Sequence, residues 1–408
     1  MRILMVTPGR LPVPAVKGGA VENLIELLLN YHENNPVAEI TVVSVYEKDA
    51  VEKSGNYRNS EFCFFKRSKF AELIMQKHWL PYRFFNYCFS VKTGRFLKKH
   101  NQFFDVIVIQ NELVNGRVFQ HFLQGKYVYH AHNDTLEINN KKDASFLKSC
   151  DCVISISEYL TNCLLQKAGL SNTATVYNGI DLELFDRKQC ILQRKELRKR
   201  FGVKVEDIVV VFAGRLVPEK GVQVLVEAIS KIPEEYHVKL LVIGASFFKE
   251  SGDNNFAKKL KEVSESIRER IIFSGYIDYK EMPAYYSMAD VGCVPSLWEE
   301  PFGLTVVEQM AMELPVIATD SGAIPEIIDE SNGYIIQRGE KLSDYIAQAI
   351  IELSVDFQKR RNMGLSGRNK AERLFNRQQF CEKWFRIVTG RSANESEMEK
   401  GMGEKTKW

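Results

Sequence analysis

The stretch EPFGLTVVE, residues 300–308, predicts a turn that leads into a buried helix. Pro301 and Gly303 are typical of the turn. The segment 306–312 predicts the first turns of the helix, which should begin near Leu304. The first turn of a helix carries unpaired N–H groups and a partial positive charge. The stretch therefore predicts a place where a phosphate can bind.

Glu300 and Glu308 lie eight positions apart at the two ends of this stretch. That spacing is roughly two helical turns, so one carboxylate can lie on each side of a phosphate bound at the helix start. A nucleotide-sugar suits this arrangement, because it has hydroxyl groups on both sides of a diphosphate. The alternative from these residues alone is that two solvated glutamates flank an ordinary helix start.

The composition is that of an ordinary globular protein. With 408 residues the chain exceeds the usual size of one hydrophobic core, which predicts two domains. Eight cysteines form no C-x-x-C pair, and no His lies at zinc-ligand spacing from Cys150 and Cys152, which predicts reduced thiols. We expect no signal peptide and no membrane span. The predicted location is cytoplasmic, with peripheral contact at the inner face of the cell membrane left open.

Short β-branched runs alternate with helical patterns along the chain, which predicts parallel sheets covered by helices on both faces. The expected strands are residues 3–6, 40–44, 62–65, 106–110, 127–130, 153–156, 175–177, 208–213, 239–243, 271–274, 291–294, 316–318 and 334–336. The expected helices include 20–31, 222–232, 255–267 and 308–312. The series restarts near residue 206 after a charged helical segment, 181–205. We therefore expect an α/β protein of two doubly wound, Rossmann-like domains that face a central cleft.

Two loops that follow predicted strands could hold a diphosphate. Gly18 and Gly19 open the first helix and permit close backbone approach, although the G-x-G-x-x-G dinucleotide pattern is absent. Arg215 and Lys220 follow the first strand of the second domain, and two cations at a sheet edge can neutralise a leaving diphosphate. The segment is no Walker loop, because Gly221 follows the lysine. Taken alone, each loop could equally be a turn or carry two surface cations.

His132 lies where a predicted strand gives way to a loop, which is the usual position of a functional residue in this architecture. His130 should lie on the same face, one pleat deeper, as a hydrogen-bonded core histidine. No third ligand is nearby, so we do not expect this pair to bind zinc.

These motifs, in this order, resemble the retaining glycosyltransferases of the GT-B fold, in the large family 4 group that builds bacterial surface polysaccharides and glycolipids. The resemblance covers about residues 1–390 and is most specific in the second half. It rests on Gly18-Gly19, His132, NGID at 178–181, the glycine-flanked Arg215 and Lys220, EPFGL…E at 300–308, and AMELPVIA…GAIPEII at 311–328.

The resemblance implies a role for each motif residue. Gly18 and Gly19 would approach the diphosphate, Arg215 and Lys220 would neutralise it, and the helix start at Thr305 and Val306 would face it. Glu308 would accept hydrogen bonds from the ribose. Ile277 would help to seat the base through backbone contacts. Glu300 would hold the hydroxyls of the donor sugar, with the N–H groups of Phe302, Gly303 and Leu304. His132 would touch the sugar near the reacting carbon.

The family also implies a same-face displacement in which the leaving phosphate helps to deprotonate the incoming hydroxyl. The chain contains no D-x-D pair, so we expect no metal and no cofactor, with Arg215 and Lys220 in place of a metal clamp. The implied domains are 1–180, completed by a returning helix at 376–390, and 181–375, the nucleotide-sugar domain. We expect residues 391–408 to form a flexible tail.

The window 66–99 holds nine basic residues, a single acid, Glu72, and several aromatics. Cations beside aromatic residues suit an anionic membrane surface, and similar enzymes meet lipid-linked acceptors in this region. The alternative is an ordinary helical face whose aromatics belong to the core. We do not expect nucleic-acid binding, because a nucleotide-sugar site already explains the cations of the cleft.

We therefore predict a glycosyltransferase that moves a hexose or N-acetylhexosamine from a nucleotide-sugar, most simply a UDP-sugar, to a saccharide or lipid-linked acceptor. A non-catalytic subunit of the same fold that stabilises an active partner is one alternative. A sugar-nucleotide epimerase is the other, and the EPFGLTVVE stretch disfavours it. The sequence leaves the donor sugar, the base, the acceptor, the linkage and the oligomeric state open.

Overall fold

The computed structural model describes residues 1–66, 82–100, 102–136, 140–244 and 255–390. The chain divides into two compact units, Met1–Tyr177 with the residues from Gln378 onward, and Asn178–Arg377. The predicted flexible tail, 391–408, and the part of the basic window at 67–81 lie outside the described residues. The predicted domain boundaries at 180/181 and 375/376 stay predictions, and each unit is described by itself below.

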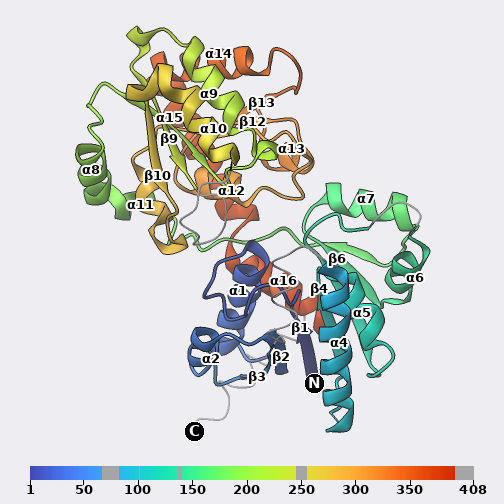
Figure 1. The fold of residues 1–408 in the computed structure, drawn as a ribbon. Coiled ribbons are helices and arrows are strands. Elements are labelled where there is room, and N and C mark those ends of the chain that lie inside the picture. The colour runs from blue at the N-terminus through green and yellow to red at the C-terminus, as the bar shows by residue number, and fades with distance from the viewer. Residues whose placement is uncertain (67–81, 101, 137–139, 245–254, 391–408) are drawn as a thin grey trace, which may run out of the picture. The chain divides into compact units, whose positions relative to one another are not determined.

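The first unit is built on a parallel sheet of seven strands in the order β3-β2-β1-β4-β5-β6-β7 (Figure 1). The strands are β1 (Arg2–Val6), β2 (Glu39–Val45), β3 (Ser60–Phe65), β4 (Val106–Gln110), β5 (Lys126–Ala131), β6 (Cys152–Ser155) and β7 (Thr173–Thr175). Central strand β4 is buried at every position, as its unbroken apolar run predicts for a sheet covered on both faces.

Helices cover both faces of this sheet. They are α1 (Ala20–Asn34), α2 (Lys48–Ser54), α4 (Tyr82–Lys99), α5 (Leu113–Phe119), α6 (Lys141–Ser149), α7 (Glu158–Ala168) and α16 (Arg377–Thr389). The strand order reverses direction at β1, so right-handed connections place α1 and α2 on one face and α4 to α7 on the other. The last helix, α16, packs on α1, with the rings of Tyr31 and Phe385 stacked 5.8 Å apart.

The second unit has a parallel sheet of six strands in the order β10-β9-β8-β11-β12-β13. The strands are β8 (Ile208–Ala213), β9 (Val238–Ile243), β10 (Ile271–Gly275), β11 (Val291–Val294), β12 (Val316–Thr319) and β13 (Gly333–Ile336). One continuous hydrophobic core joins one face of the sheet to α9 and α14, through residues such as Val210, Leu225 and Ile350.

The helices of the second unit are α8 (Ile191–Arg200), α9 (Val222–Lys231), α10 (Asn255–Val263), α11 (Met282–Ser287), α12 (Leu304–Ala311), α13 (Ile324–Ile327), α14 (Leu342–Val355) and α15 (Phe357–Leu374). Short 3-10 helices lie at Arg187–Cys190, Pro218–Lys220, Glu234–Tyr236, Ser264–Arg270 and Tyr279–Glu281. The charged helix α8 is anchored by Arg194 and Arg198, which pair with Asp290 at 2.7 and 3.1 Å.

The predicted fold class of two parallel-sheet, Rossmann-like domains is confirmed. The predicted strands are present except that the one expected at 175–177 lies two residues earlier, at Thr173–Thr175. One helix was predicted too long. The segment 255–267 is α-helical only to Val263 and continues as a 3-10 helix, in which Ile267 leaves helical geometry with φ −124°. No helix in the described part of the chain is long and apolar enough to cross a membrane. The central cleft stays a prediction.

Candidate functional site

The loops that follow β8, β11 and β12 meet at the carboxyl edge of the second sheet. Gly221 has φ 71°, and a Cβ at this residue would lie 1.8 Å from the carbonyl oxygen of Pro295. A Cβ at Gly322 would lie 2.1 Å from the carbonyl oxygen of Glu300. Only glycine permits these approaches. They concentrate three loops at the edge where open α/β sheets bind their ligands.

Lys220 and Glu300, from two of these loops, form an ion pair. The Lys220 Nζ donates to Glu300 Oε1 at 2.7 Å and lies 4.8 Å from the ring centroid of Trp298. The same carboxylate oxygen accepts from the Ser296 hydroxyl, and Glu300 is 6% exposed. The cation and the carboxylate are therefore fixed before any ligand arrives. The sequence reasoning missed Ser296 and Trp298. Ser296 lies only four positions before its partner Glu300, whereas Trp298 contacts Lys220 of a distant loop.

Helix α12 begins at Leu304, as predicted. Phe302 is buried and its ring meets that of Phe375 edge-on at 5.7 Å, which anchors the turn. Gly303 has φ 110°, and a Cβ at this residue would lie 2.7 Å from a side chain of α13. This glycine therefore directs the chain into the helix. The first turn of α12 contains Leu304, predicted to donate to the sugar hydroxyls, and Thr305 and Val306, predicted to face a phosphate.

Glu308 is a buried carboxyl on α12. It is 6% exposed, and its Oε2 accepts a hydrogen bond from the Tyr286 hydroxyl at 2.8 Å. Burial raises the pKa of Glu308 to about 7, and hydrogen bonds from Tyr286 and Tyr279 offset part of that rise. A carboxylate held in this way needs further donors to stabilise its charge. Both tyrosines were missed by the sequence reasoning, because only tertiary packing brings them to Glu308.

Arg215 and Ile277 follow β8 and β10 at the same edge of the sheet. The Arg215 guanidinium is partly exposed and lies 3.9 Å from Glu219 Oε1, a loose pairing that leaves it available. Gly275, at the end of β10, has φ 74°, and among the described residues no atom beyond its chain neighbours lies within 4 Å of where its Cβ would be. Ile277 follows two positions later and is half-buried.

The glycine turn of the first unit has the predicted backbone. Gly18 and Gly19 have φ of 76° and 105° and precede α1. A Cβ at Gly19 would lie 2.2 Å from Glu22 Oε2 and 2.8 Å from Leu11, so the missing side chain makes room for a carboxyl of the same helix. Burial raises the pKa of Glu22 to about 7. The sequence reasoning missed Glu22, which reads as an ordinary first-turn acid.

His132 directly follows β5 and belongs to a buried polar cluster. Its Nε2 lies 2.8 Å from Gln110 Oε1, which can only accept, so the ring proton is on Nε2 and Nδ1 is an acceptor. Nδ1 has no partner in the described part of the chain. Burial lowers the pKa of His132 to about 3. His130 is fully buried and accepts from Trp384 Nε1 at 3.2 Å, as expected for a core histidine.

Models of known families match most of this chain. Residues 193–370 match "Glycosyl transferases group 1", and residues 37–184 match "Glycosyltransferase Family 4". The chain belongs to the family 4 glycosyltransferases. The predicted family is therefore confirmed, and the two matched segments correspond to the two units.

Relatives of this glycosyltransferase extend over its whole length. It is 26% identical over 397 residues to spore coat protein SA of Bacillus subtilis, covering 94% of this chain and 97% of that protein. It is 27% identical to the lipopolysaccharide 1,2-N-acetylglucosaminetransferase of Salmonella typhimurium over 56% of this chain and 58% of the relative. The structure of Anabaena Alr3699/HepE in complex with UDP has a TM-score of 0.75 at 21% identity, covering 96% of this chain and all of that one.

In this glycosyltransferase, Gln110→Leu should lower turnover about tenfold, because the hydrogen bond that fixes the His132 proton on Nε2 is lost. Gln110→Glu should restore much of the turnover, because a carboxylate also accepts from Nε2–H. The added charge should raise the pKa of His132 and introduce a new pH dependence of turnover at low pH. A Glu variant as inactive as the Leu variant, with an unchanged pH profile, would contradict this positioning role.

The described part of the basic window, residues 66 and 82–99, has both exposed and buried aromatic side chains. Phe84, Tyr87 and Phe96 on α4 are exposed, at 49%, 53% and 41%, whereas Phe85 is buried. The Lys66 ammonium lies 4.4 Å from the ring centroid of Tyr46, and the Lys66 carbonyl accepts from Lys92 Nζ of α4 at 3.3 Å. The aromatics of α4 are therefore divided between surface and core. Contact of residues 66–99 with an anionic membrane stays a prediction.

Proposed function

We propose that this protein is a retaining glycosyltransferase that moves a hexose or N-acetylhexosamine from a UDP-sugar to a saccharide or lipid-linked acceptor in cell-surface glycoconjugate synthesis. One observation carries the proposal. At a single sheet edge of the second unit, a preformed lysine–carboxylate pair, a helix start and a second buried carboxyl, Glu308, occur together. A nucleotide-sugar has a diphosphate and hydroxyl groups at both ends, so it can use all of these groups at once.

The diphosphate is the group that the cations and the helix start suit. Lys220 is held by Glu300 and Trp298, so little reorganisation is needed when negative charge develops on the leaving phosphate. Arg215 is less constrained and can turn toward the phosphates. The first N–H groups of α12 add partial positive charge without a side chain.

The carboxyl groups would hold the two ends of the donor. Glu308 would accept the ribose hydroxyls, which supply the donors that a buried carboxylate needs. Glu300 has one oxygen on Lys220 and Ser296, and its other oxygen would accept from the hydroxyls of the sugar. Ile277, which follows β10 at the same sheet edge, would seat the base through its backbone.

For the chemical step we propose a displacement on one face of the sugar. The bond from the anomeric carbon to the phosphate oxygen breaks, and the acceptor oxygen bonds to the same face. The acceptor proton passes to the departing phosphate. His132 is neutral, and it would touch the sugar near the reacting carbon and so help to orient that carbon.

The UDP part of the proposal draws on relatives of the same fold, since Alr3699/HepE has been solved with UDP and with UDP-glucose. The test is a screen for release of the nucleoside diphosphate from UDP-glucose, UDP-N-acetylglucosamine and GDP-mannose. We expect a UDP-sugar to be hydrolysed fastest. Preference for GDP-mannose would overturn the assignment of the base. Binding of UDP without hydrolysis or transfer of any donor would favour a non-catalytic subunit.

A further inference from the structure

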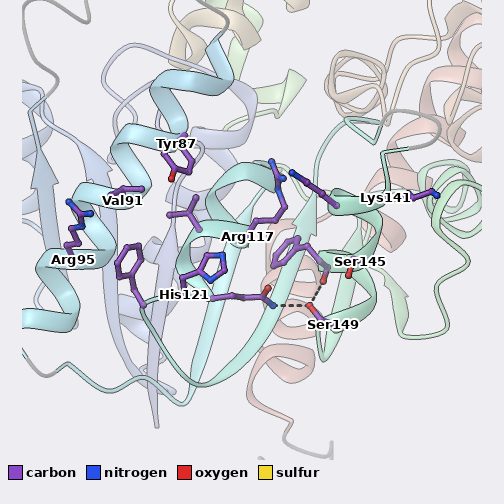
Figure 2. A pocket seen from close by; sticks show the side chains of 13 residues that line it. Tyr87, Val91, Arg95, Arg117, His121, Lys141, Ser145 and Ser149 are labelled. Atoms are coloured by element: carbon purple, nitrogen blue, oxygen red, sulfur yellow. Dashed lines mark hydrogen bonds between the residues drawn. The ribbon is translucent and has the colours of Figure 1, made fainter.

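The first unit has a pocket of about 860 Å³ on the outer surface of α4, α5 and α6 (Figure 2). Ligand pockets commonly have volumes of about 300–1,000 Å³. Figure 2 shows Tyr87, Val91 and Arg95 along one side and Ser145 of α6 on the other. The three residues of α4 are spaced by four positions, so they form one stripe of the helix.

Two glycines make room for the aromatic side chains of this pocket. A Cβ at Gly116 of α5 would lie 2.0 Å from the ring of Phe146, and one at Gly94 of α4 would lie 2.5 Å from the ring of Phe122. Phe146 is buried and forms part of the lining, while Phe122 is half-buried. The hollow is therefore built by specific close packing rather than left over between helices.

The lining is basic. Its described residues include Arg95, Arg117, Lys141 and Lys142, and none of them is acidic. Arg117 is fixed from behind, because its Nε lies 2.9 Å from Oδ1 of the fully buried Asp143. No described carboxylate forms an ion pair with the other three cations. Such an arrangement favours an anionic ligand.

Polar and aromatic groups complete the lining. Gln120 Nε2 donates to the Ser149 hydroxyl at 2.9 Å, and that hydroxyl donates to the Phe146 carbonyl at 2.7 Å, so the Gln120 amide is held in place. Tyr87 is 53% exposed and offers a ring face. An aromatic ring beside amide and hydroxyl groups suits the apolar face and the hydroxyls of a sugar.

We propose that this pocket binds a phosphorylated sugar, with the phosphate on the cations and the ring against Tyr87. The site is separate from His132, because α5 leaves the carboxyl edge after β4 and the pocket is lined by its last turn and the residues that follow. The proposed transferase function supplies only the reason to expect a sugar phosphate, either free or as the headgroup of a lipid-linked saccharide. Binding itself does not depend on that function.

The experiment is isothermal titration calorimetry of the full chain with glucose 6-phosphate, in the presence of saturating UDP so that the donor site is filled. Inorganic phosphate and glucose are the partial probes. We expect glucose 6-phosphate to bind more tightly than either. Lys142→Ala should weaken it about tenfold, as for the loss of one hydrogen bond to a charged group. Tyr87→Ala should also weaken it, with a smaller effect on inorganic phosphate.

Matched variants serve as controls. Lys148 is exposed on the same helix as Lys142, and Phe84 is as exposed on α4 as Tyr87, but neither lines the pocket. Lys148→Ala and Phe84→Ala should leave the affinity for glucose 6-phosphate unchanged, and all four variants should bind UDP normally. Absence of binding, equal loss in the controls, or inorganic phosphate binding as tightly as glucose 6-phosphate would overturn the proposal.

Sedimentation with phosphatidylcholine vesicles that contain phosphatidylinositol distinguishes the two sources of the ligand. Vesicle binding that glucose 6-phosphate displaces would place the sugar phosphate on a lipid. No vesicle binding, with glucose 6-phosphate still bound, would support a free sugar phosphate. A third outcome is that the wild type binds vesicles, loses this binding on Lys142→Ala, and does not bind glucose 6-phosphate at all. That result would show a membrane-contact surface and overturn the proposal of a sugar-phosphate pocket. If the protein binds glucose 6-phosphate in this pocket but hydrolyses no donor, the result contradicts the proposed transferase function and leaves the pocket proposal standing.

Discussion

Replacing Arg215 and Lys220 together by alanine should lower turnover with the preferred UDP-sugar at least about a hundredfold, the usual effect of removing preorganised charge at a leaving group. Lys220 should contribute more than Arg215. Its ammonium is already fixed between Glu300 at 2.7 Å and the ring of Trp298, whereas the Arg215 guanidinium is only loosely paired with Glu219.

The Lys220→Ala variant needs two controls. Lys220→Ala leaves Glu300 buried without its cation, which alone can destabilise the second unit. Lys220→Ala combined with Glu300→Gln removes that unpaired charge, and it should restore thermal stability without restoring turnover. Lys231→Ala, at the other end of α9, removes an equally ion-paired lysine away from the sheet edge and should leave turnover unchanged.

The same reasoning predicts that activity survives EDTA. In the part of the chain that the structure describes, no three His, Cys, Asp or Glu side chains come together in a way that could hold a metal ion. If the two cations neutralise the diphosphate, a chelator should lower turnover little. Complete loss of activity in EDTA that Mg²⁺ or Mn²⁺ restores would contradict this role for Arg215 and Lys220.

Glu308→Gln should weaken UDP binding by about 1–1.5 kcal/mol, because ribose hydroxyls would donate to a neutral amide, and a hydrogen bond to a neutral group contributes about that much less than one to a carboxylate. The Tyr286 hydroxyl can still donate to the amide oxygen, so the packing around α12 is kept. UDP affinity of the wild type should also rise as pH increases through about 7, where Glu308 loses its proton. The variant should lack that rise, and calorimetry over this pH range measures both.

The same substitution should stabilise the protein at alkaline pH. Because burial raises the pKa of Glu308 from 4.5 to about 7, the folded state binds this proton more tightly than the unfolded state. The contribution to stability is therefore complete below pH 4.5 and is lost as pH rises to about 7. Above that pH, Glu308→Gln should be more stable than the wild type by about 3 kcal/mol.

Thermal unfolding of the two proteins at acidic and alkaline pH checks this sign. Glu22 in the first unit also has a pKa raised to about 7 and acts in the same pH range. The difference between wild type and Glu308→Gln is therefore the quantity to compare, not the wild-type curve alone. A variant that is less stable than the wild type at alkaline pH would contradict the raised pKa of Glu308. A variant that binds UDP as well as the wild type would remove Glu308 from the nucleotide site.

The fold and the positions of the loops were predictable from local patterns. Strands such as β4 and β8 were predicted at their observed bounds, because buried parallel strands are continuous β-branched runs. The start of α12 at Leu304 was predicted from Pro301 and Gly303, whose backbone preferences depend on their own chemistry. The helix after 255 was the exception, since nothing local marks its change to a 3-10 helix after Val263.

The environment of each site residue was decided by the tertiary structure. Glu308 reads as an ordinary helix glutamate until Tyr286, 22 positions away, is found to donate to it in a buried place. Gln110 ends β4 and His132 directly follows β5, and their hydrogen bond exists because these two strands are neighbours. Lys220 and Glu300 are 80 positions apart in the sequence.

The sequence alone therefore determined the elements, the family and the residues that carry charge to the sheet edges. These features depend on a residue's own chemistry and on neighbours within a few positions. Burial and long-range pairing decided the rest: which carboxyl keeps its proton near neutral pH, which nitrogen of His132 accepts, and which cation is held before the donor arrives. Desolvation and hydrogen bonding depend on the groups that folding brings within a few ångströms, and sequence spacing does not encode those distances.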